Sequence, residues 1–449
     1  MSIWVQSREF MNRPFKYIVV SISTILVALI LGGSLVGQSR VASAESGTPY
    51  HHLSVYAEVL GKIKSDYVEE PDMKNVTLGA INGLLISIDP FASYLNAEQF
   101  KEYTKDKQLK RAGVGLVLSR KYGYEINIVD AIPGSPADKA GLSTGDIVES
   151  LNGIQTRDMP LAFADLLLEG DPGTTVDLTV LRLRKPDPTT IKLTRVEIKP
   201  APVVAKMIDE QTGLIQVHNL NAGKSAEVAA AVKDLTRQGA KRLVLDLRHD
   251  AVSSVEEGIA VANLFLEKGT IATLQGQKVP KASLEADPSK TIYKGPLVVL
   301  TNRGTLGAAE IVAAALIDNK RAQGVGERTF GDAAVRKVIP TEDGGAVLLA
   351  VAKYYSPAGK AIQDNPVTPA FVVNDIDGDS ADEEEVESPA PTAAPAAPKK
   401  SGEDPVLKKA LDVLNGTATI EAAKTVPQPP KPKTDETLPT TPSNPPHQK

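Results

Sequence analysis

The chain has 449 residues, of which 42% are apolar and only 4% aromatic, so it can hold two or three domains with mainly aliphatic cores. Its 50 basic and 55 acidic residues leave a formal net charge of −5 without a basic stripe, which argues against a nucleic-acid-binding protein. The absence of cysteine excludes disulfides, and the five histidines lack metal-ligand spacing, so neither a zinc site nor another cofactor is expected.

Residues 1–44 are predicted to be a signal peptide or an N-terminal membrane anchor. Three basic residues precede residues 17–36, which carry no charge, and Ala42 and Ala44 follow in the pattern that a signal peptidase cleaves. The uncharged run is long for a signal peptide and barely long enough to span a bilayer, so cleavage and retention in the inner membrane both stay open. In either case we expect the rest of the chain to be exported to the periplasm or another extracytoplasmic space.

Residues 45–106 are expected to form an N-terminal helical segment. Apolar residues recur every three or four positions between residues 54 and 100, as they do on one face of a helix. Asp89 and Pro90 should end the second helix, because proline cannot donate a hydrogen bond and disfavours a helical residue before it. The charged residues 101–111 are interpreted as a connector.

Residues 107–196 have the pattern of short strands with tight turns and one helix, at about residues 160–169. The segment Gly113-Val114-Gly115-Leu116 with Val117 resembles the carboxylate-binding loop and second strand of PDZ domains, and residues 132–142, 145–148 and 151–154 resemble later turns of that fold. In such a loop, backbone N–H groups converge on a peptide's terminal carboxylate, and the open strand edge accepts the peptide as an added strand. The resemblance therefore implies an inserted, β-rich PDZ domain that binds peptides at residues 113–117.

Residues 197–375 alternate strands and helices. Strands are predicted at residues 213–217, 243–247 and 297–300, and helices at residues 225–238, 255–266 and 308–319. This alternation predicts a mostly parallel sheet with helices packed on its faces.

Five blocks in this region, in order after the PDZ-like segment, resemble those of the carboxy-terminal processing (tail-specific) serine proteases; they are residues 243–248, 296–303, 310–313, 325–331 and 352–363. Residues 88–95 resemble that family's segment before its PDZ domain. The resemblance implies an α/β protease-like (ClpP/crotonase-like) core with an inserted PDZ domain. It also implies a catalytic serine, a lysine that takes its proton and a glutamine that orients the lysine.

The positions that correspond to this serine, lysine and glutamine carry Gly307, Asp332 and Arg336. Residues 250–254 replace a family turn that helps to form the oxyanion hole. Glycine has no nucleophile and an acid is a poor substitute for an amine base, so the resemblance implies a catalytically degenerate member. Asp332 and Arg336, four residues apart, could pair with each other. The expected function is that of a non-catalytic adaptor or regulator that binds protein C-termini or unfolded polypeptides.

Two other functions stay open. One is an active serine-type endopeptidase that cleaves C-terminal tails through a rewired site, with Thr305 as the nearest hydroxyl. His249, Asp250 and Ser253 include the residue types of a triad, but residues so close in one turn rarely converge, which favours a polar loop. The other is a structural subunit that assembles with an active paralogous protease or as a homo-oligomer.

Residues 376–449 are expected to be a mostly disordered tail, because an acidic run followed by proline-rich and alanine-rich sequence cannot bury enough apolar surface. A short helix is expected at residues 404–415, with Asp404 as its N-terminal cap and Gly416 at its end.

Overall fold

The computed structural model describes residues 49–106, 112–120, 125–157, 159–182, 185–373 and 404–418. The expected signal peptide or anchor, residues 1–44, lies outside these ranges, as does most of the tail. Within the described ranges, no helix is both long enough and apolar enough to cross a bilayer. The chain divides into two compact units, residues 1–78 and 79–449, which are described separately.

The first unit contains α2 (Pro49–Asp66) and the start of α3 (Met73–Ile88). Asp72 caps α3, since its Oδ1 accepts hydrogen bonds from the backbone N–H groups of Lys74 and Asn75. In the second unit α3 stops at Ile88, directly before Asp89 and Pro90, as the proline predicts.

The prediction of a connector at residues 101–111 is wrong for residues 101–106, because these belong to α4 (Ala97–Asp106). Asn96 and Gln99 form a capping box: Asn96 Oδ1 accepts from the N–H groups of Glu98 and Gln99, and Gln99 Oε1 accepts from Asn96 N–H. This start signal lies in polar residues, which the apolar spacing did not reveal.

The PDZ module, formed by the described residues between 112 and 196, is an antiparallel sheet with strand order β2-β3-β4-β6-β7, and β5 pairs with β4. Its strands are β2 (Leu116–Ser119), β3 (Ile126–Ala131), β4 (Ile147–Leu151), β5 (Ile154–Gln155), β6 (Thr175–Arg182) and β7 (Lys185–Thr194), and its helices are α5 (Pro136–Lys139) and α6 (Leu161–Leu168). Among the described residues, β2 pairs only with β3, so its other edge is not used by this sheet.

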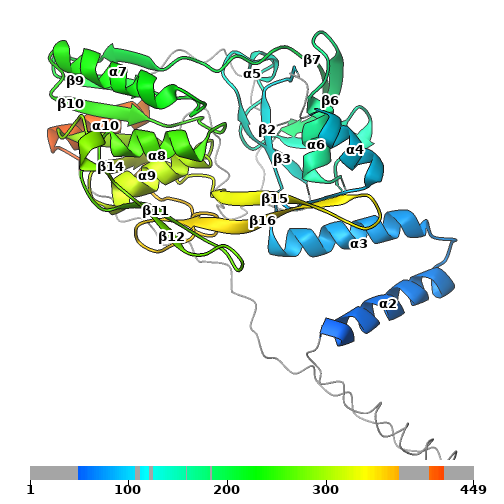
Figure 1. Ribbon diagram of the computed structural model, residues 1–449. Coiled ribbons are helices and arrows are strands. Elements are labelled where there is room, and N and C mark those ends of the chain that lie inside the picture. Colours follow the sequence, from blue (N-terminus) through cyan, green and yellow to red (C-terminus); the bar gives the residue numbers. More distant parts are fainter. Residues whose placement is uncertain are drawn as a thin grey trace, which may run out of the picture. The chain divides into compact units, whose positions relative to one another are not determined.

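The α/β domain is built on a second sheet with strand order β17-β14-β13-β10-β9-β8, parallel except for β8. Its strands are β8 (Val204–Met207), β9 (Thr212–Gln216), β10 (Arg242–Asp246), β13 (Leu297–Thr301), β14 (Gln323–Gly326) and β17 (Phe371–Val372). Helices α7 (Lys224–Arg237), α8 (Val255–Asn263) and α9 (Ala308–Asp318) cover one face (Figure 1). These elements match the predicted alternation of strands and helices.

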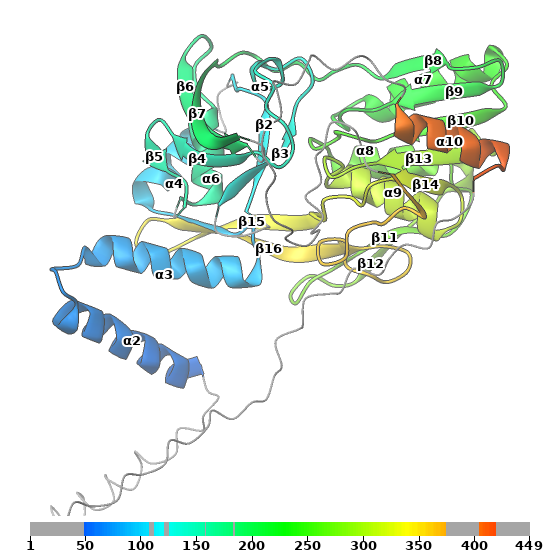
Figure 2. The ribbon, with the colours of Figure 1, turned by 180° about the vertical axis from the view of Figure 1, so that it is seen from behind.

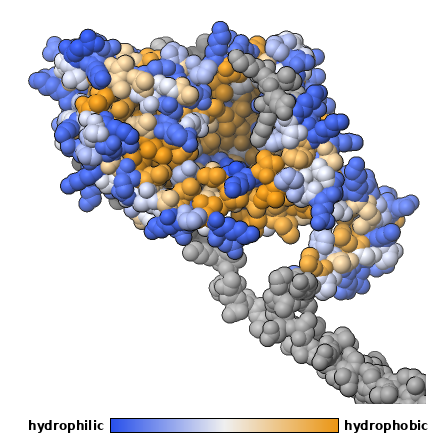
Figure 3. Space-filling model, viewed as in Figure 1, coloured by the Kyte–Doolittle hydropathy of each residue, from blue (hydrophilic) through white to orange (hydrophobic). Residues whose placement is uncertain are grey.

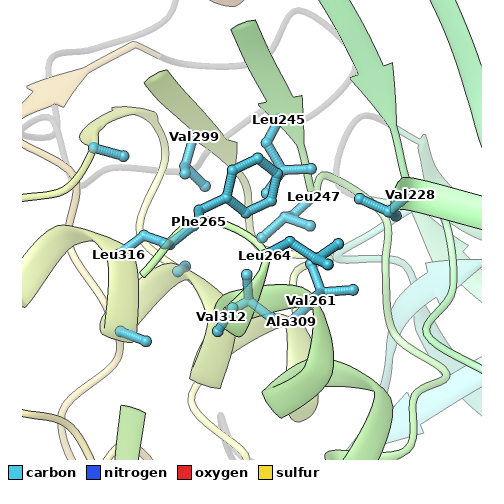
Figure 4. Close-up of a cluster of buried hydrophobic side chains, with 14 of the residues drawn as sticks. Val228, Leu245, Leu247, Val261, Leu264, Phe265, Val299, Ala309, Val312 and Leu316 are labelled. Atoms are coloured by element: carbon cyan, nitrogen blue, oxygen red, sulfur yellow. The ribbon is translucent and has the colours of Figure 1, made fainter. Parts of the chain in front are cut away.

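The core of the α/β domain lies between this sheet and α7 to α9. Phe265 is 1% exposed and packs among Leu245 and Val299 of the sheet and Val312 and Leu316 of α9 (Figure 4). Alternate residues of the same strands point to the opposite face, where they form a separate apolar cluster.

The predicted tail helix is α10 (Pro405–Asn415), which covers that opposite face (Figure 2). Asp404 Oδ1 accepts a hydrogen bond from Leu407 N–H, and Gly416 ends the helix with a φ of 72°. Val406 and Ala410 are fully buried against the sheet. The helix is therefore part of the folded domain, although it lies within a tail-like sequence.

A smaller sheet of order β1-β16-β11-β12, with β15 paired to β16, completes the second unit. Its strands are β1 (Ser93–Leu95), β11 (Thr270–Gln275), β12 (Ala282–Glu285), β15 (Ala334–Pro340) and β16 (Ala346–Tyr355). Because β1 precedes the PDZ module and β16 belongs to the C-terminal half of the chain, their pairing closes the fold around the inserted module.

Candidate functional site

Gly307, the predicted nucleophile position, lies in the turn between β13 and α9. Its φ of 62° and ψ of −116° are rare for residues with a side chain. A Cβ atom on Gly307 would lie 3.3 Å from Ser253 Oγ and 3.8 Å from the backbone oxygen of Asp332. The structure thus brings positions 307, 332 and 253 together, but position 307 offers no side-chain oxygen.

Glu310 holds this arrangement in place. It is fully buried, and its carboxylate accepts hydrogen bonds from the backbone N–H groups of Gly307 at 3.1 Å, Gly331 at 2.6 Å and Asp332 at 2.8 Å. The Thr329 hydroxyl donates a fourth. Burial raises the pKa of Glu310 to about 7 in spite of these donors. The sequence analysis did not single out Glu310, although it lies in one of the family-like blocks.

Asp332 and Arg336, at the predicted lysine and glutamine positions, form an ion pair in which both guanidinium Nη atoms donate to the Asp332 carboxylate. The guanidinium also lies 4.6 Å from the centroid of the Phe91 ring and 3.9 Å from Asp89 Oδ2. The ion pair joins a loop residue to a residue of β15 rather than two turns of a helix. Opposite Arg336, β16 carries a bulge, because Val335 pairs with Ala352 and Arg336 with Ala350. The Asp332 carboxylate is therefore paired with a cation.

Thr305, the alternative hydroxyl that the sequence suggested, is fully buried. Its Oγ1 donates to the Leu247 carbonyl at 2.9 Å and accepts from Asn302 N–H at 3.0 Å. Because its single proton already has a backbone acceptor, Thr305 has the contacts of a structural residue.

Ser253 and Ser254 also have structural contacts. Ser253 Oγ accepts a hydrogen bond from Ala308 N–H at 3.0 Å, at the N-terminus of α9. Ser254 caps α8 by accepting from Glu257 N–H, and it donates to Glu256 at 2.7 Å.

His249 pairs across the molecule with Asp130 of β3, in the PDZ module. Its Nδ1 lies 2.8 Å from Asp130 Oδ1, and its Nε2 lies 2.9 Å from Asn302 Nδ2. With the Asn302 amide oriented this way its nitrogen can only donate, so Nε2 accepts and Nδ1–H donates to Asp130. No sequence pattern pointed to Asp130, which is 119 residues away from His249.

Asp250 does not join a triad either. It is fully buried, and neither of its carboxyl oxygens has a hydrogen-bond partner among the described residues. Burial, and then the charge of Asp130, raise the pKa of Asp250 well above its usual value. The triad residue types at 249–254 thus diverge within the loop, in line with the polar-loop interpretation.

The predicted peptide-binding residues 113–117 line a cleft of about 630 Å³ that also contacts α6 and the loops after β9 and β10. Figure 3 shows a hollow lined by apolar side chains on this face of the molecule. Gly113 N–H donates to the Val196 carbonyl at 2.9 Å, so that N–H is already used. Gly115 has a φ of 79°, and a Cβ there would lie 2.2 Å from Ser135 Cβ, so only glycine fits. A carboxylate would have to bind the loop after Gly113.

The residues that the structure describes contain no cluster of three or more histidine or acidic side chains that could hold a metal ion.

A family model for peptidase family S41 matches residues 211–373, and one for the PDZ domain matches residues 128–182. The carboxy-terminal-processing protease of Bartonella bacilliformis is 31% identical over 355 residues, which cover 78% of this chain and 81% of that protein. The chain belongs to the carboxy-terminal processing protease family.

Two further matches agree with this assignment. The carboxy-terminal processing protease CtpA of Bacillus subtilis is 32% identical over 362 residues, covering 80% of this chain and 77% of that protein. The solved structure of a photosystem II D1 C-terminal processing protease is 27% identical, with a TM-score of 0.59 over 71% of this chain and 92% of that one. This member of the carboxy-terminal processing protease family thus has the S41 fold with a PDZ domain.

Proposed function

We propose that this family member binds the C-terminal ends of polypeptides through its PDZ domain and does not hydrolyse peptide bonds. The observation that carries the proposal is the pair of substitutions at the centre of the site. Gly307 has no nucleophile, and Asp332 is bound to Arg336. Serine-type hydrolysis needs a hydroxyl beside a group that takes its proton.

A rewired protease site is the competing proposal, and the surrounding contacts do not favour it. The Thr305 proton is directed to a backbone carbonyl, and Ser253 accepts an N–H at a helix terminus. His249, in the loop beside the site, has its Nε2 directed to Asn302 rather than to a serine.

Peptide binding is supported by the glycine-containing loop and by the edge of β2 that the described sheet leaves unused. A peptide added to this edge would gain main-chain hydrogen bonds, and its terminal carboxylate would lie beside the loop. The basic and apolar pattern of residues 1–44 supports a location outside the cytoplasm, where the protein would act as an adaptor or as a partner of an active paralogous protease.

The test is incubation of the purified full chain with an unfolded protein that ends in apolar residues, with binding and cleavage measured together. An active member of the family provides the positive control for cleavage. We expect binding without cleavage, and no labelling of the chain by a fluorophosphonate. Cleavage by the wild type that disappears in Thr305→Ala or Ser253→Ala would establish a rewired site and overturn the proposal.

A further inference from the structure

The cleft beside the PDZ loop is acidic. Its lining includes four carboxylate side chains and, among the described residues, no lysine or arginine; the four are Asp130, Asp165, Glu169 and Glu197. A cleft lined by one sign of charge concentrates ligands of the opposite sign, because its walls focus the field. The negative charge of the cleft therefore favours peptide tails that carry positive charge.

Asp130 indicates that a ligand with hydrogen-bond donors would be stabilised here. The residue is 2% exposed, and its Oδ1 is bound to His249, while its Oδ2 has no partner among the described residues. A buried carboxylate oxygen without a donor is costly, and an incoming N–H group removes that cost. Burial raises the pKa of Asp130, and the contact with His249 opposes this rise. A cation beside Asp130 would lower its pKa further and favour the ionised carboxylate.

Asp165 lies along the helical wall of the cleft. Ala112 and Gly170 bond to each other through both N–H groups at 3.0 Å, which places the end of α6 beside the start of the carboxylate loop. Leu168 lines the cleft at this end, and Asp165, three residues earlier, lies about 4.5 Å further from that end along the helix axis. An extended peptide advances about 3.3 Å per residue and turns alternate side chains to the same face. The next side chain on the face of the last residue, two positions before it, is therefore the one that would lie nearest Asp165.

Water reaches the Asp165 side chain. The surrounding protein, and then the charge of Glu169, nevertheless raise the pKa of Asp165 to about 7. A cationic side chain placed beside Asp165 would favour the ionised carboxylate, so the attraction strengthens as the ligand binds.

We propose that the cleft selects polypeptide C-termini that carry lysine or arginine two positions before the last residue, and that Asp165 pairs with that residue. This inference rests on the proposed function, since it names the class of tail that the PDZ domain binds.

The test compares short peptides that end in leucine and carry lysine, glutamine or glutamate two positions before it. Each peptide is made with a free and with an amidated C-terminus, and its affinity for the full chain is measured by fluorescence anisotropy. We expect the lysine peptide to bind about fivefold more tightly than the glutamine peptide, and the glutamate peptide to bind most weakly. Asp165→Asn should abolish the lysine preference. Asp187→Asn, the same change on an exposed part of β7 outside the cleft, should leave it intact.

The outcomes separate the two proposals. If free-acid peptides bind no more tightly than their amides, the proposed function is wrong. If the free carboxylate matters but lysine gives no advantage over glutamine, only the basic-tail inference is overturned. A lysine preference that survives in a correctly folded Asp165→Asn protein would overturn the role of Asp165.

Discussion

Gly307 adopts a backbone conformation that suits glycine and disfavours serine, and this limits any attempt to restore catalysis. A side chain there would sit at a φ of 62°, with its Cβ atom 3.3 Å from Ser253 Oγ. Beside it, Asp332 is bound to Arg336, and Glu310 occupies the backbone N–H groups of positions 307 and 332. The residues of the site thus hold one another in place through hydrogen bonds and an ion pair.

Gly307→Ser alone should therefore give no hydrolysis and no fluorophosphonate labelling. It should also lower stability by about 1–2 kcal/mol, because a residue with a Cβ is strained at positive φ. Adding Asp332→Lys and Arg336→Gln should recover at most a trace of activity, since the altered turn at residues 250–254 lacks the family's oxyanion arrangement and one lost donor costs about 10²–10³ in rate. Robust labelling of the single variant would contradict this expectation.

Glu310→Gln should destabilise the α/β domain by about 1–3 kcal/mol, because the amide nitrogen would face groups that themselves donate hydrogen bonds. The effect should depend on pH. The pKa of Glu310 is 4.5 in its usual state and about 7 in the folded protein. Between these two pH values, Glu310 therefore holds a proton in the folded protein that it has lost in the unfolded chain. The free energy of unfolding of the wild type should thus fall as pH rises through this window. Measured by denaturant unfolding at several pH values, this free energy should depend less on pH in Glu310→Gln. An equal dependence on pH in both proteins would indicate that Glu310 is already ionised in the folded protein.

At the scale of elements, α10 is the segment whose attachment is least evident from the chain. Arg248 donates to Asp246 at 2.8 Å and to Asp404 at 2.7 Å, so it ties the end of β10 to the N-terminal cap of α10. Burial alone would raise the pKa of Asp404, but hydrogen bonds from Arg248 and Leu407 N–H lower it. The apolar face of the helix, this charged contact, and a hydrogen bond from Arg242 to Asn415 at its other end hold α10 on the sheet.

Asp404→Ala should loosen α10 at a cost of about 1–2 kcal/mol, because it removes both the cap and the ion pair. Asp404→Asn, which caps a helix equally well, should lose only the charged contribution and so serves as the matched control. Since the folded pKa of Asp404 is lowered, its contribution is present above the usual pKa and is lost as pH falls through the folded value. Amide hydrogen exchange in β13 and β14, which α10 covers, measures how often the helix detaches. If Asp404→Ala and Asp404→Asn lose the same protection, the ion pair stabilises the helix and the cap does not.

For the whole molecule, the described contact between Asp130 and His249 joins the PDZ domain to the loop after β10. The same loop lies against the cleft that takes the peptide in our proposal. Peptide binding and the contact between the two domains therefore share residues.

Asp130→Asn should weaken this contact, because it replaces a carboxylate acceptor with an amide of the same size. We expect faster hydrogen exchange in β3 and in the loop at residues 249–252, and unchanged exchange in the core of α9. Asp187→Asn is again the control for a lost surface charge. Exchange that changes equally in both variants would argue against the contact in solution.

The sequence alone indicated the family, the order of the elements and the identity of the residues, Gly307, Asp332 and Arg336, at the positions that the resemblance assigns to catalysis. The family and these positions depend on contiguous blocks, because the roles of residues such as Gly113, Gly115 and Gly307 follow from a resemblance that consecutive residues carry, while the order of the elements follows from periodicity. The cap signals at Asp404 and Gly416 likewise predicted α10 from eleven consecutive residues.

Only the tertiary structure decided how side chains that are distant in sequence pair. His249 contacts Asp130 across 119 residues, and Arg248 contacts Asp404 across 156. The acidic lining of the cleft likewise combines Asp130 of β3, Asp165 and Glu169 at α6, and Glu197 of the loop after β7. A sequence pattern shows the periodicity of apolar residues and the positions of local turns. Hydrogen bonds and electrostatic interactions depend instead on distance in space, so the partners of these charged groups could not be predicted from the sequence.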